Sequence, residues 1–255
     1  MSMARDHSAD GWRAARRRLS RIDPVLGGVI RATGPCTLVP GFTGAPFNHL
    51  THAIAHQQLN GAAANTILKR FLAIYGDTEH PTPEQVLTTD PRRLRAAGLS
   101  LGKIAAIRDL AAKVLDGTVP ARGAELESLA DQEIIARLTA VRGIGPWTVQ
   151  MLLLFQLGRM DVLPVDDFGV RQGFMLAYGL RSMPHPQALA IFAERWSPWR
   201  GIASWYLWRA VDLHREQRLP TPPQPPPRVR KPAQRRRRAK NKPVARVSVR
   251  QRDVS

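Results

Sequence analysis

The sequence predicts an all-α protein of roughly ten helices, and three observations support this prediction. From Phe47 to Glu216, apolar residues recur at three- and four-residue spacing, the period of a helix with one buried face. Residues that start or stop helices separate these apolar stretches. The alternating pattern of a half-buried β-strand is almost absent. A chain of 255 residues can bury a sizeable core in one large or two small domains.

The expected helices begin or end at recognisable residues. Asn60-Gly61 separates the first two long helices, and Gly117 ends a long amphipathic one. Thr82 and Asp90 each precede a proline and begin a short helix. The helix expected at 147–156 is the most apolar and should be central to the core. Longer helices are expected at residues 49–59, 62–75, 100–115, 147–156, 167–178, 186–195 and 199–216. Two further short helices are expected within residues 126–138.

Three segments differ in composition. Residues 1–45 are interpreted as an N-terminal arm and loop, in which the first 20 or so residues form a mobile or loosely helical basic arm. Residues 22–47 are rich in Gly and Pro and are expected to be dominated by loops. Residues 46–219 form the helical domain. Residues 220–255 open with seven prolines in thirteen residues and have no periodicity, which predicts a disordered Pro/Arg-rich tail.

The chain is strongly basic. A net charge of +18 and an isoelectric point near 11.5 indicate a polyanionic partner. Residues 220–255 contain 12 Lys and Arg against one Asp, yet the rest of the chain is still basic. The tail is interpreted as a solubilising extension, and weak non-specific affinity for nucleic acid phosphates is compatible with it.

The single cysteine, Cys36, limits the chemistry of the chain. It excludes a disulfide within the monomer and a four-cysteine iron–sulfur cluster, and it makes a reducing cytoplasm the expected compartment. The N-terminus is Arg-rich and lacks the apolar core of a signal peptide. The longest apolar run, residues 149–157, is too short to span a bilayer, so we predict no membrane association.

Residues 138–151, LTAVRGIGPWTVQM, carry the most specific motif of the chain. The Gly-Ile-Gly turn between two apolar runs is a helix-hairpin-helix signature. Such a turn directs backbone N–H groups outward at the start of a helix, which suits a phosphate oxygen of DNA. We expect the N–H groups near Gly143, Gly145 and Thr148 to make this contact.

Two carboxylates follow the hairpin. Asp166 and Asp167 lie after Pro164 and before an apolar helix. Asp is common at helix N-caps, so capping alone is one interpretation. A fixed carboxylate can also be catalytic, because it stabilises positive charge that develops during a reaction. The hairpin upstream favours the catalytic interpretation.

The hairpin, the Gly/Pro loop and the Asp together resemble the helix-hairpin-helix, Gly/Pro-loop-Asp DNA glycosylase superfamily. The resemblance is closest to the 3-methyladenine DNA glycosylase II family, over about residues 45–216, and it implies two helical subdomains flanking a cleft. Counted without a gap from Trp147, the family's catalytic Asp falls on Asp167. Matching from Pro164, as in the 8-oxoguanine branch, selects Asp166. The gapless count is preferred, and Asp166 is then expected to cap the helix.

The resemblance also implies a pocket for the damaged base. In this family a tryptophan eight residues after a Pro-Trp-Arg triplet faces the base, which selects Trp208, and Trp147 matches a second pocket tryptophan. Aromatic faces attract a cationic alkylated purine by about 0.5–2 kcal/mol. The family's pocket tyrosine is Met151 here, which makes the pocket softer. The neighbouring tryptophans are expected to fill the core: Trp196, Trp199 and Trp205.

The segment His56-Gln-Gln-Leu-Asn-Gly61 lies between two expected helices. In the resembling family the leucine there enters the minor groove, which implies that Leu59 is the wedge when a base is turned out of the duplex. From burial tendencies alone, a Leu59 folded back on the core is equally plausible. The family also implies that carbonyls of the hairpin can hold a monovalent cation, and that no cofactor is required.

Three histidines recur on one face of the first expected helix: His49, His52 and His56. This spacing occurs in metal sites. No acidic or cysteine ligand lies beside them in the sequence, and a closed zinc site needs more ligands. We therefore predict no metal at this face.

The resemblance implies a monofunctional glycosylase that removes alkylated purines from double-stranded DNA in base excision repair. Members that also cut the strand carry a Lys where this chain has Trp147, and Lys103 and Lys113 lie on another helix. A bifunctional glycosylase/lyase, which needs an amine nucleophile, is the first alternative. A non-catalytic helix-hairpin-helix DNA-binding protein is the second. The protein is expected to act as a monomer in the cytoplasm, associated with the nucleoid if bacterial.

Overall fold

The computed structural model describes residues 9–76 and 80–222, and all regular structure within them is helical. The predicted all-α class is confirmed. None of the described helices has the length and apolarity that a membrane span requires. The helices are α1 (Ala9–Ile22), α2 (Pro24–Thr33), α3 (Pro46–His56), α4 (Gly61–Ala73), α5 (Pro83–Thr88), α6 (Pro91–Ala96), α7 (Leu101–Leu115), α8 (Gly123–Ser128), α9 (Asp131–Thr139), α10 (Pro146–Phe155), α11 (Phe168–Ala177), α12 (Pro186–Ala193), the 3₁₀ helix η2 (Glu194–Trp196) and α13 (Arg200–Arg215).

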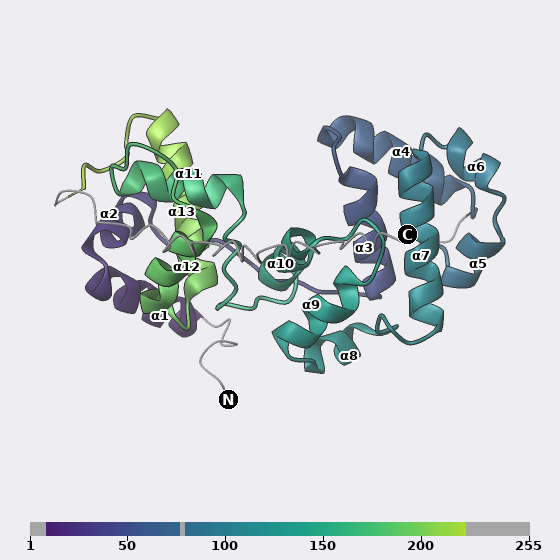
Figure 1. The fold of residues 1–255 in the computed structure, drawn as a ribbon, viewed down its shortest axis with the longest axis horizontal. Helices are drawn as coiled ribbons and strands as arrows, with labels where there is room; N and C mark the ends of the chain where they lie inside the picture. Colours follow the sequence, from purple (N-terminus) through teal and green to yellow (C-terminus); the bar gives the residue numbers. More distant parts are fainter. Residues whose placement is uncertain (1–8, 77–79, 223–255) are drawn as a thin grey trace, which may run out of the picture.

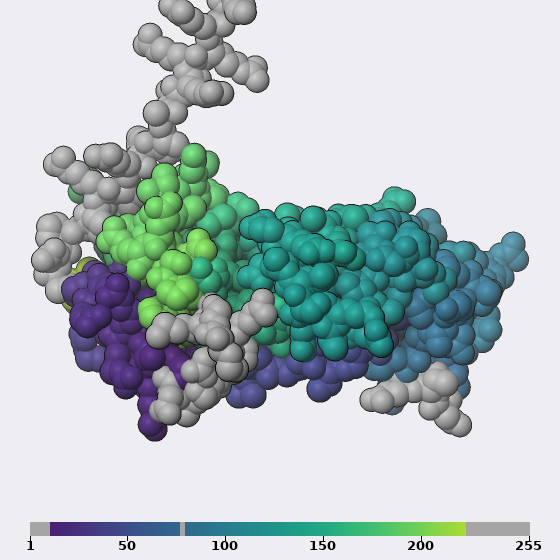
Figure 2. Space-filling model, turned by 90° about the horizontal axis from the view of Figure 1, so that it is seen from below, coloured from purple at the N-terminus to yellow at the C-terminus, as the bar shows by residue number. Residues whose placement is uncertain are grey.

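The helices form two lobes, shown side by side in Figure 1 with α10 between them. The first lobe, α3 to α10, surrounds an apolar core that includes Leu50, Ile107 and Leu153. The second lobe, α1, α2 and α11 to α13, surrounds another core that includes Phe174 and Trp196. Figure 2 shows the N-terminal helices, in purple, at one end of the molecule and the blue helices of the first lobe at the other. Two helical subdomains are therefore present, as predicted.

Side-chain caps confirm several helix starts read from the sequence. At α5, Thr82 and Gln85 form a capping box, in which the Gln85 N–H donates to Thr82 Oγ1 (3.3 Å) and the Thr82 N–H donates to Gln85 Oε1 (2.8 Å). Asp90 and Ser100 accept hydrogen bonds from the first turns of α6 and α7. These bonds satisfy N–H groups that have no partner within the helix.

The N-terminal segment differs from its prediction. Residues 9–33 form α1 and α2 instead of a loose arm followed by loops. Helix α1 buries Ala15 and Leu19 in the second core, and α2 begins at the buried Asp23. The Asp23 carboxylate accepts from the Tyr178 hydroxyl (2.6 Å) and Trp196 Nε1 (2.9 Å), which ties α2 to the C-terminal helices. The predicted disordered tail lies, from residue 223 on, outside the described residues.

Close packing of α13 against its neighbours sets the geometry of the second lobe. A Cβ at Gly173 of α11 would collide with the Leu207 backbone carbonyl of α13. A Cβ at Gly201 would lie 2.5 Å from Leu154 Cδ2 of α10. Glycine at these two positions lets the helices approach each other closely, and this approach turns one face of α13 toward the start of α11.

Candidate active site

Asp167 begins α11, and three donors fix its carboxylate. As the N-cap, its Oδ1 accepts from the Val170 N–H at 2.7 Å. Trp208 Nε1 donates to the same oxygen at 2.8 Å, and Trp147 Nε1 donates to Oδ2 at 2.7 Å. Asp167 is 9% exposed. The structure thus brings together the aspartate and the two tryptophans that the sequence singled out.

The carboxylate of Asp167 retains room for one further partner. An ionised carboxylate offers about four lone-pair positions. Within the described residues, Oδ1 accepts two hydrogen bonds and Oδ2 accepts one. The remaining position on Oδ2 can receive a water molecule or face a positively charged group. A charge held in place in this way stabilises developing positive charge without reorganising during the reaction.

The expectation that Asp166 caps the helix is wrong, because Asp167 is the N-cap and Asp166 is exposed. Asp167 has the extended backbone of an N-cap (φ −65°, ψ 126°), and its N–H donates to the Pro164 carbonyl at 3.1 Å. Capping and catalysis appeared as alternatives in the sequence. They are compatible here, since the cap bond occupies a single lone pair of the carboxylate.

Trp208 is held where the two lobes meet. Its ring stacks on Phe155 of α10, with centroids 5.5 Å apart, and it packs against both cores. A Cβ at Gly169 would lie 2.7 Å from Trp208 Cδ1 and 2.9 Å from Nε1. The missing side chain at Gly169 therefore lets the indole reach Asp167. Sequence analysis missed both Phe155 and Gly169.

An ion pair fixes the start of α13. Arg200 Nε and Nη2 donate to Asp161 Oδ1 and Oδ2 at 2.8 and 2.9 Å. The Arg200 backbone N–H donates to Oδ1 at 3.2 Å, and Ser197 Oγ donates to Oδ2 at 3.0 Å. The hydrogen bond to Asp161 raises the pKa of Arg200. The ends of the Asp161-to-Arg200 segment are thereby joined, and Asp167 lies within that segment.

A cavity of about 750 Å³ opens beside this group, between α3 and α10. Trp147, Met151 and Phe155 line it from α10, and His49 and His56 line it from α3. Asp167 and Trp208 adjoin it through Trp147 and Phe155 instead of lining it. Its volume lies within the range of small-molecule sites, and its wall is aromatic and apolar with a few polar groups. Met151 is placed in the wall of this cavity, where the sequence resemblance expected a pocket residue.

The hairpin joins α9 to α10. Gly143 has φ +77°, a conformation that favours glycine, and it is exposed. The Arg142 N–H donates to Asp109 Oδ2 at 2.7 Å, and Gln57 Nε2 donates to the Gly143 carbonyl at 2.9 Å. These two bonds connect the hairpin to α7 and to the end of α3. Sequence analysis gave no sign of them, because the partners are 33 and 86 residues apart.

The N-terminus of α10 presents backbone donors. Gly145 is the N-cap and makes no side-chain cap bond, so the N–H groups of the first turn, including that of Thr148, have no acceptor within the helix. Trp147 follows Pro146 and is 49% exposed. This arrangement matches the predicted phosphate contact at Gly143, Gly145 and Thr148, and the contact itself stays a prediction.

Leu59 lies in the turn between α3 and α4 and is 40% exposed, outside both cores. The neighbouring Gln58 has φ +58°, and Asn60 caps α4 by accepting from the Ala63 N–H at 2.9 Å. An exposed apolar side chain on a fixed polar turn has the placement of a wedge. Phe168, which follows Asp167, is exposed too and was not singled out in the sequence.

The histidines of α3 make local hydrogen bonds. His49 Nε2 bonds with the Thr43 carbonyl (2.6 Å), and His56 Nδ1 bonds with the His52 carbonyl (2.9 Å). Burial and the nearby His56 and His80 lower the pKa of His52. Among the described residues, no group of three or more His, Cys, Asp or Glu is arranged to hold a metal ion. His49 and His56 form a polar edge of the cavity.

The chain matches a known family and known proteins in sequence. Residues 51–199 match the family described as HhH-GPD superfamily base excision DNA repair protein. The chain is 34% identical over 206 residues to the alkylbase DNA glycosidase-like protein mag2 of Schizosaccharomyces pombe, covering 80% of this chain and 96% of that one. It is 39% identical over 168 residues to DNA-3-methyladenine glycosylase 1 of the same organism, covering 66% and 73%.

Solved structures of proteins with similar names are also similar to this chain in fold. The Schizosaccharomyces pombe 3-methyladenine DNA glycosylase in complex with abasic DNA is 36% identical, with a TM-score of 0.66 over 77% of this chain and 95% of that one. DNA-3-methyladenine glycosidase from Bacillus halodurans is 33% identical, with a TM-score of 0.71 over 80% and 91%. The relatives named here are thus enzymes or enzyme-like proteins of DNA base repair, and one of these structures contains DNA.

Proposed function

The chain belongs to the HhH-GPD superfamily of base excision DNA repair proteins, and we propose that it is a monofunctional glycosylase for alkylated purines of the 3-methyladenine type in double-stranded DNA. One observation carries the proposal. The Asp167 carboxylate is held by Trp147 and Trp208 beside a cavity whose volume is typical of small-molecule sites. A fixed negative charge and aromatic walls are what hydrolysis of a cationic nucleotide needs.

The proposed reaction breaks the bond between the sugar C1′ and the purine nitrogen. The electron pair of that bond goes to the alkylated base, which loses its positive charge as it leaves. The sugar becomes positively charged, and the Asp167 carboxylate stabilises it. A water molecule then adds to C1′ and gives up a proton to the carboxylate or to solvent. The products are free base and an unbroken strand with an abasic site.

The cavity supplies the binding part of the proposal. The base is turned out of the duplex, which costs a few kcal/mol and is cheapest for a damaged base. It would lie against Trp147, Met151 and Phe155, with Trp208 behind Phe155. The flexible Met151 gives a wall that adapts to more than one alkylated purine. Leu59 would fill the gap left in the duplex.

The hairpin would hold the backbone of the same DNA. Its donors at the start of α10 would bind a phosphate near Gly143, Gly145 and Thr148. A monovalent cation on the hairpin carbonyls and action as a monomer remain parts of this proposal. The Gly143 carbonyl accepts one hydrogen bond, from Gln57, which leaves it one lone pair for such a cation.

The positions of the lysines support base release without strand cleavage. Trp147 occupies the position at which strand-cutting members of the superfamily carry their lysine. Lys103 Nζ donates to the Ala55 carbonyl at 2.7 Å, and Lys113 Nζ bonds to Asp109 at 2.6 Å. Neither lysine lines the cavity. A lyase needs an amine that can reach the sugar.

The test is a release assay on methylated duplex DNA. We expect free 3-methyladenine or 7-methylguanine, with strand breaks appearing only after alkali treatment. Asp167→Asn should lower single-turnover release by about 100-fold or more, the usual cost of removing one preorganised electrostatic contact. Its DNA affinity should be retained, since the shape is kept and a negative charge is removed. Asp166→Asn, at the exposed neighbour, is the matched control and should release base normally.

Each alternative has its own outcome. A covalent DNA adduct trapped by borohydride would replace the proposal with a glycosylase/lyase. No base release from the panel by the unmodified protein, with DNA binding intact, would replace it with a non-catalytic DNA-binding protein.

A further inference from the structure

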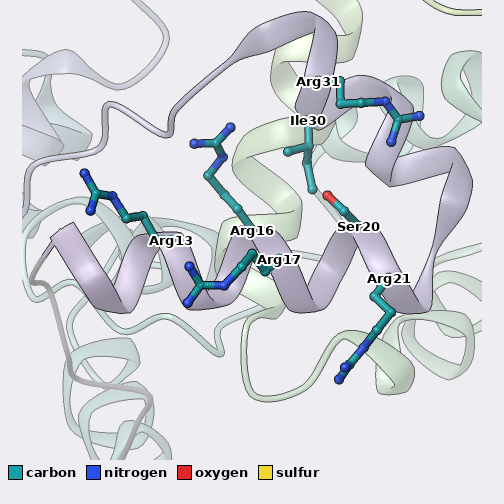
Figure 3. A pocket seen from close by; sticks show the side chains of 7 residues that line it. All are labelled: Arg13, Arg16, Arg17, Ser20, Arg21, Ile30 and Arg31. Carbon is teal, nitrogen blue, oxygen red and sulfur yellow. The ribbon is translucent and has the colours of Figure 1, made fainter.

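A second hollow, lined by basic residues, lies in the second lobe and is formed by α1 and α2. It has a volume of about 600 Å³, and five arginines line it together with Ser20 and Ile30. The arginines are Arg13, Arg16, Arg17, Arg21 and Arg31 (Figure 3). None of the described residues that line the hollow is acidic. Helix α1 packs against α2 and η2, at the end of the molecule that carries the N-terminal helices in Figures 1 and 2.

These arginines cost the helix stability. Arg13, Arg16, Arg17 and Arg21 are three to four residues apart on α1, so like charges face each other across each turn. Within the described part of the chain, no ion pair joins Arg17, Arg21 or Arg31 to a carboxylate. The Arg16 Nε is buried and has no hydrogen-bond partner. Arg17, Arg21 and Arg31 therefore have unused capacity to bind an anion.

The shape of the cluster favours a row of anions over a single one. Figure 3 shows Arg13 and Arg16 extending from the same side of α1, Arg31 of α2 at the other end, and Arg21 directed to the opposite side. The guanidinium groups are spread around the hollow and do not meet at one point. Eight residues of helix separate Arg13 from Arg21, a rise of about 12 Å at 1.5 Å per residue. Each strand of a duplex presents a phosphate about every 3.4 Å along its axis, so this length spans several phosphates.

A lipid surface fits less well. Binding at a membrane surface needs a free apolar face beside the cations. Ala15 and Leu19 of α1 are fully buried in the second core, and Trp12 and Ile22 are partly buried against it. Among the α1 residues whose burial is described, the exposed ones are all arginines, so the face that α1 offers to solvent is basic.

We propose that the α1–α2 hollow is a second DNA-binding surface, which grips the phosphate backbone of the duplex away from the Asp167 site. It would extend the contact with undamaged DNA and raise affinity without reading sequence. The proposal rests on the proposed function to the extent that DNA is the substrate. The surface lies within the described second lobe.

The experiment compares the full-length protein with Arg17→Gln/Arg21→Gln/Arg31→Gln. All three side chains are exposed, so the variant should fold, which circular dichroism and the melting temperature will check. Affinity for an undamaged duplex of about 30 base pairs is measured from low to moderate salt. Each lost phosphate contact lowers the slope of log affinity against log salt by about 0.9, so three lower it by about 2.7.

The control removes the same charge elsewhere, as Arg92→Gln/Arg93→Gln/Arg215→Gln, at exposed arginines of α6 and α13. A fall in slope of at least about 1 in the α1–α2 variant but not in the control supports the proposal. A smaller fall, or the same fall in both, overturns it. An unchanged slope together with α1-dependent binding of polyglutamate would assign the hollow to an acidic protein and also overturn it. Base release by the unmodified protein is scored separately, so failure of the proposed function is recognised on its own.

Discussion

Replacing Trp208 by Phe tests whether the indole N–H, as distinct from the aromatic surface, positions Asp167. The substitution keeps a ring against Phe155 and removes the donor that lies 2.8 Å from Asp167 Oδ1. A hydrogen bond to a charged group is worth about 1.5–3 kcal/mol. At about 1.4 kcal/mol per factor of ten, complete loss in the transition state would slow base release by about 10- to 150-fold.

The two tryptophans should differ in the size of this effect. Trp208 packs against both cores, so water cannot easily replace its N–H, and Trp208→Phe should lie toward the upper end of the range. Trp147 is 49% exposed, so water can substitute for its N–H, and Trp147→Phe should lie toward the lower end. The assay is single-turnover release of 7-methylguanine with enzyme in excess, alongside thermal melting.

Trp205→Phe is the matched control, because Trp205 is buried on the same helix and, within the described part of the chain, makes no hydrogen bond to Asp167. The reasoning is refuted if Trp147→Phe and Trp208→Phe lose no more activity than Trp205→Phe. It is also refuted if their loss of activity only follows a loss of folded protein, since the tryptophans would then be core residues and nothing more.

Three further predictions concern the parts that support the site. Gly169→Ala should displace the Trp208 ring, because the new Cβ would lie 2.7 Å from it. Base release should fall about as far as in Trp208→Phe, whereas normal release would show that the ring can move without affecting Asp167. Leu59→Ala should slow release from duplex DNA more than from single-stranded DNA and leave the melting temperature unchanged, because Leu59 lies outside both cores; equal effects on the two substrates would contradict a wedge. For Asp109, burial raises the pKa, but hydrogen bonds from Arg142 N–H and Lys113 outweigh it and lower the pKa from its usual value. The ionised Asp109 therefore contributes fully to the free energy of unfolding at neutral pH, and this contribution is lost as pH falls through the lowered pKa. The difference in the free energy of unfolding between the unmodified protein and Asp109→Asn should narrow only below about pH 4. A difference that narrows near neutral pH would exclude Asp109 as its source.

Local signals in the sequence identified the helices of the middle of the chain. Thr82, Asp90 and Ser100 each place a side chain that caps its own helix, so a few adjacent residues are enough to locate the start. The packed helix α1 was predicted only as a mobile or loosely helical arm because it is crowded with arginines, and α2 was missed because residues 22–47 are rich in Gly and Pro. The spacing of Ala15 and Leu19 is helical, but their buried face becomes apparent only against the second core.

The difference between local and long-range signals also separates the candidate-site residues that the sequence singled out from those that it did not. Asp167, Trp147 and Trp208 were found because they stand at fixed distances from motifs: the hairpin and the Pro198-Trp-Arg triplet. Phe155 and Gly169 act through contacts with Trp208, 53 and 39 residues away in the sequence, and no local pattern reveals such pairs. The choice of Asp166 as the cap failed for a related reason, since the backbone of the turn decides which of two neighbours becomes the N-cap.

The hydrogen bonds to Asp167 come from both lobes, so the candidate site lies where the two lobes meet. Trp147 belongs to the first lobe, whereas Trp208 and Asp167 belong to the second. The bond from Trp147 therefore forms across the junction, and Trp208 completes the set by packing on Phe155 of the opposite lobe. If the lobes separated, the carboxylate would keep its cap bond to Val170 but lose the Trp147 donor on Oδ2. The orientation of the charge thus depends on correct docking of the lobes, and DNA held by the hairpin as proposed would meet that charge only when the docking is intact.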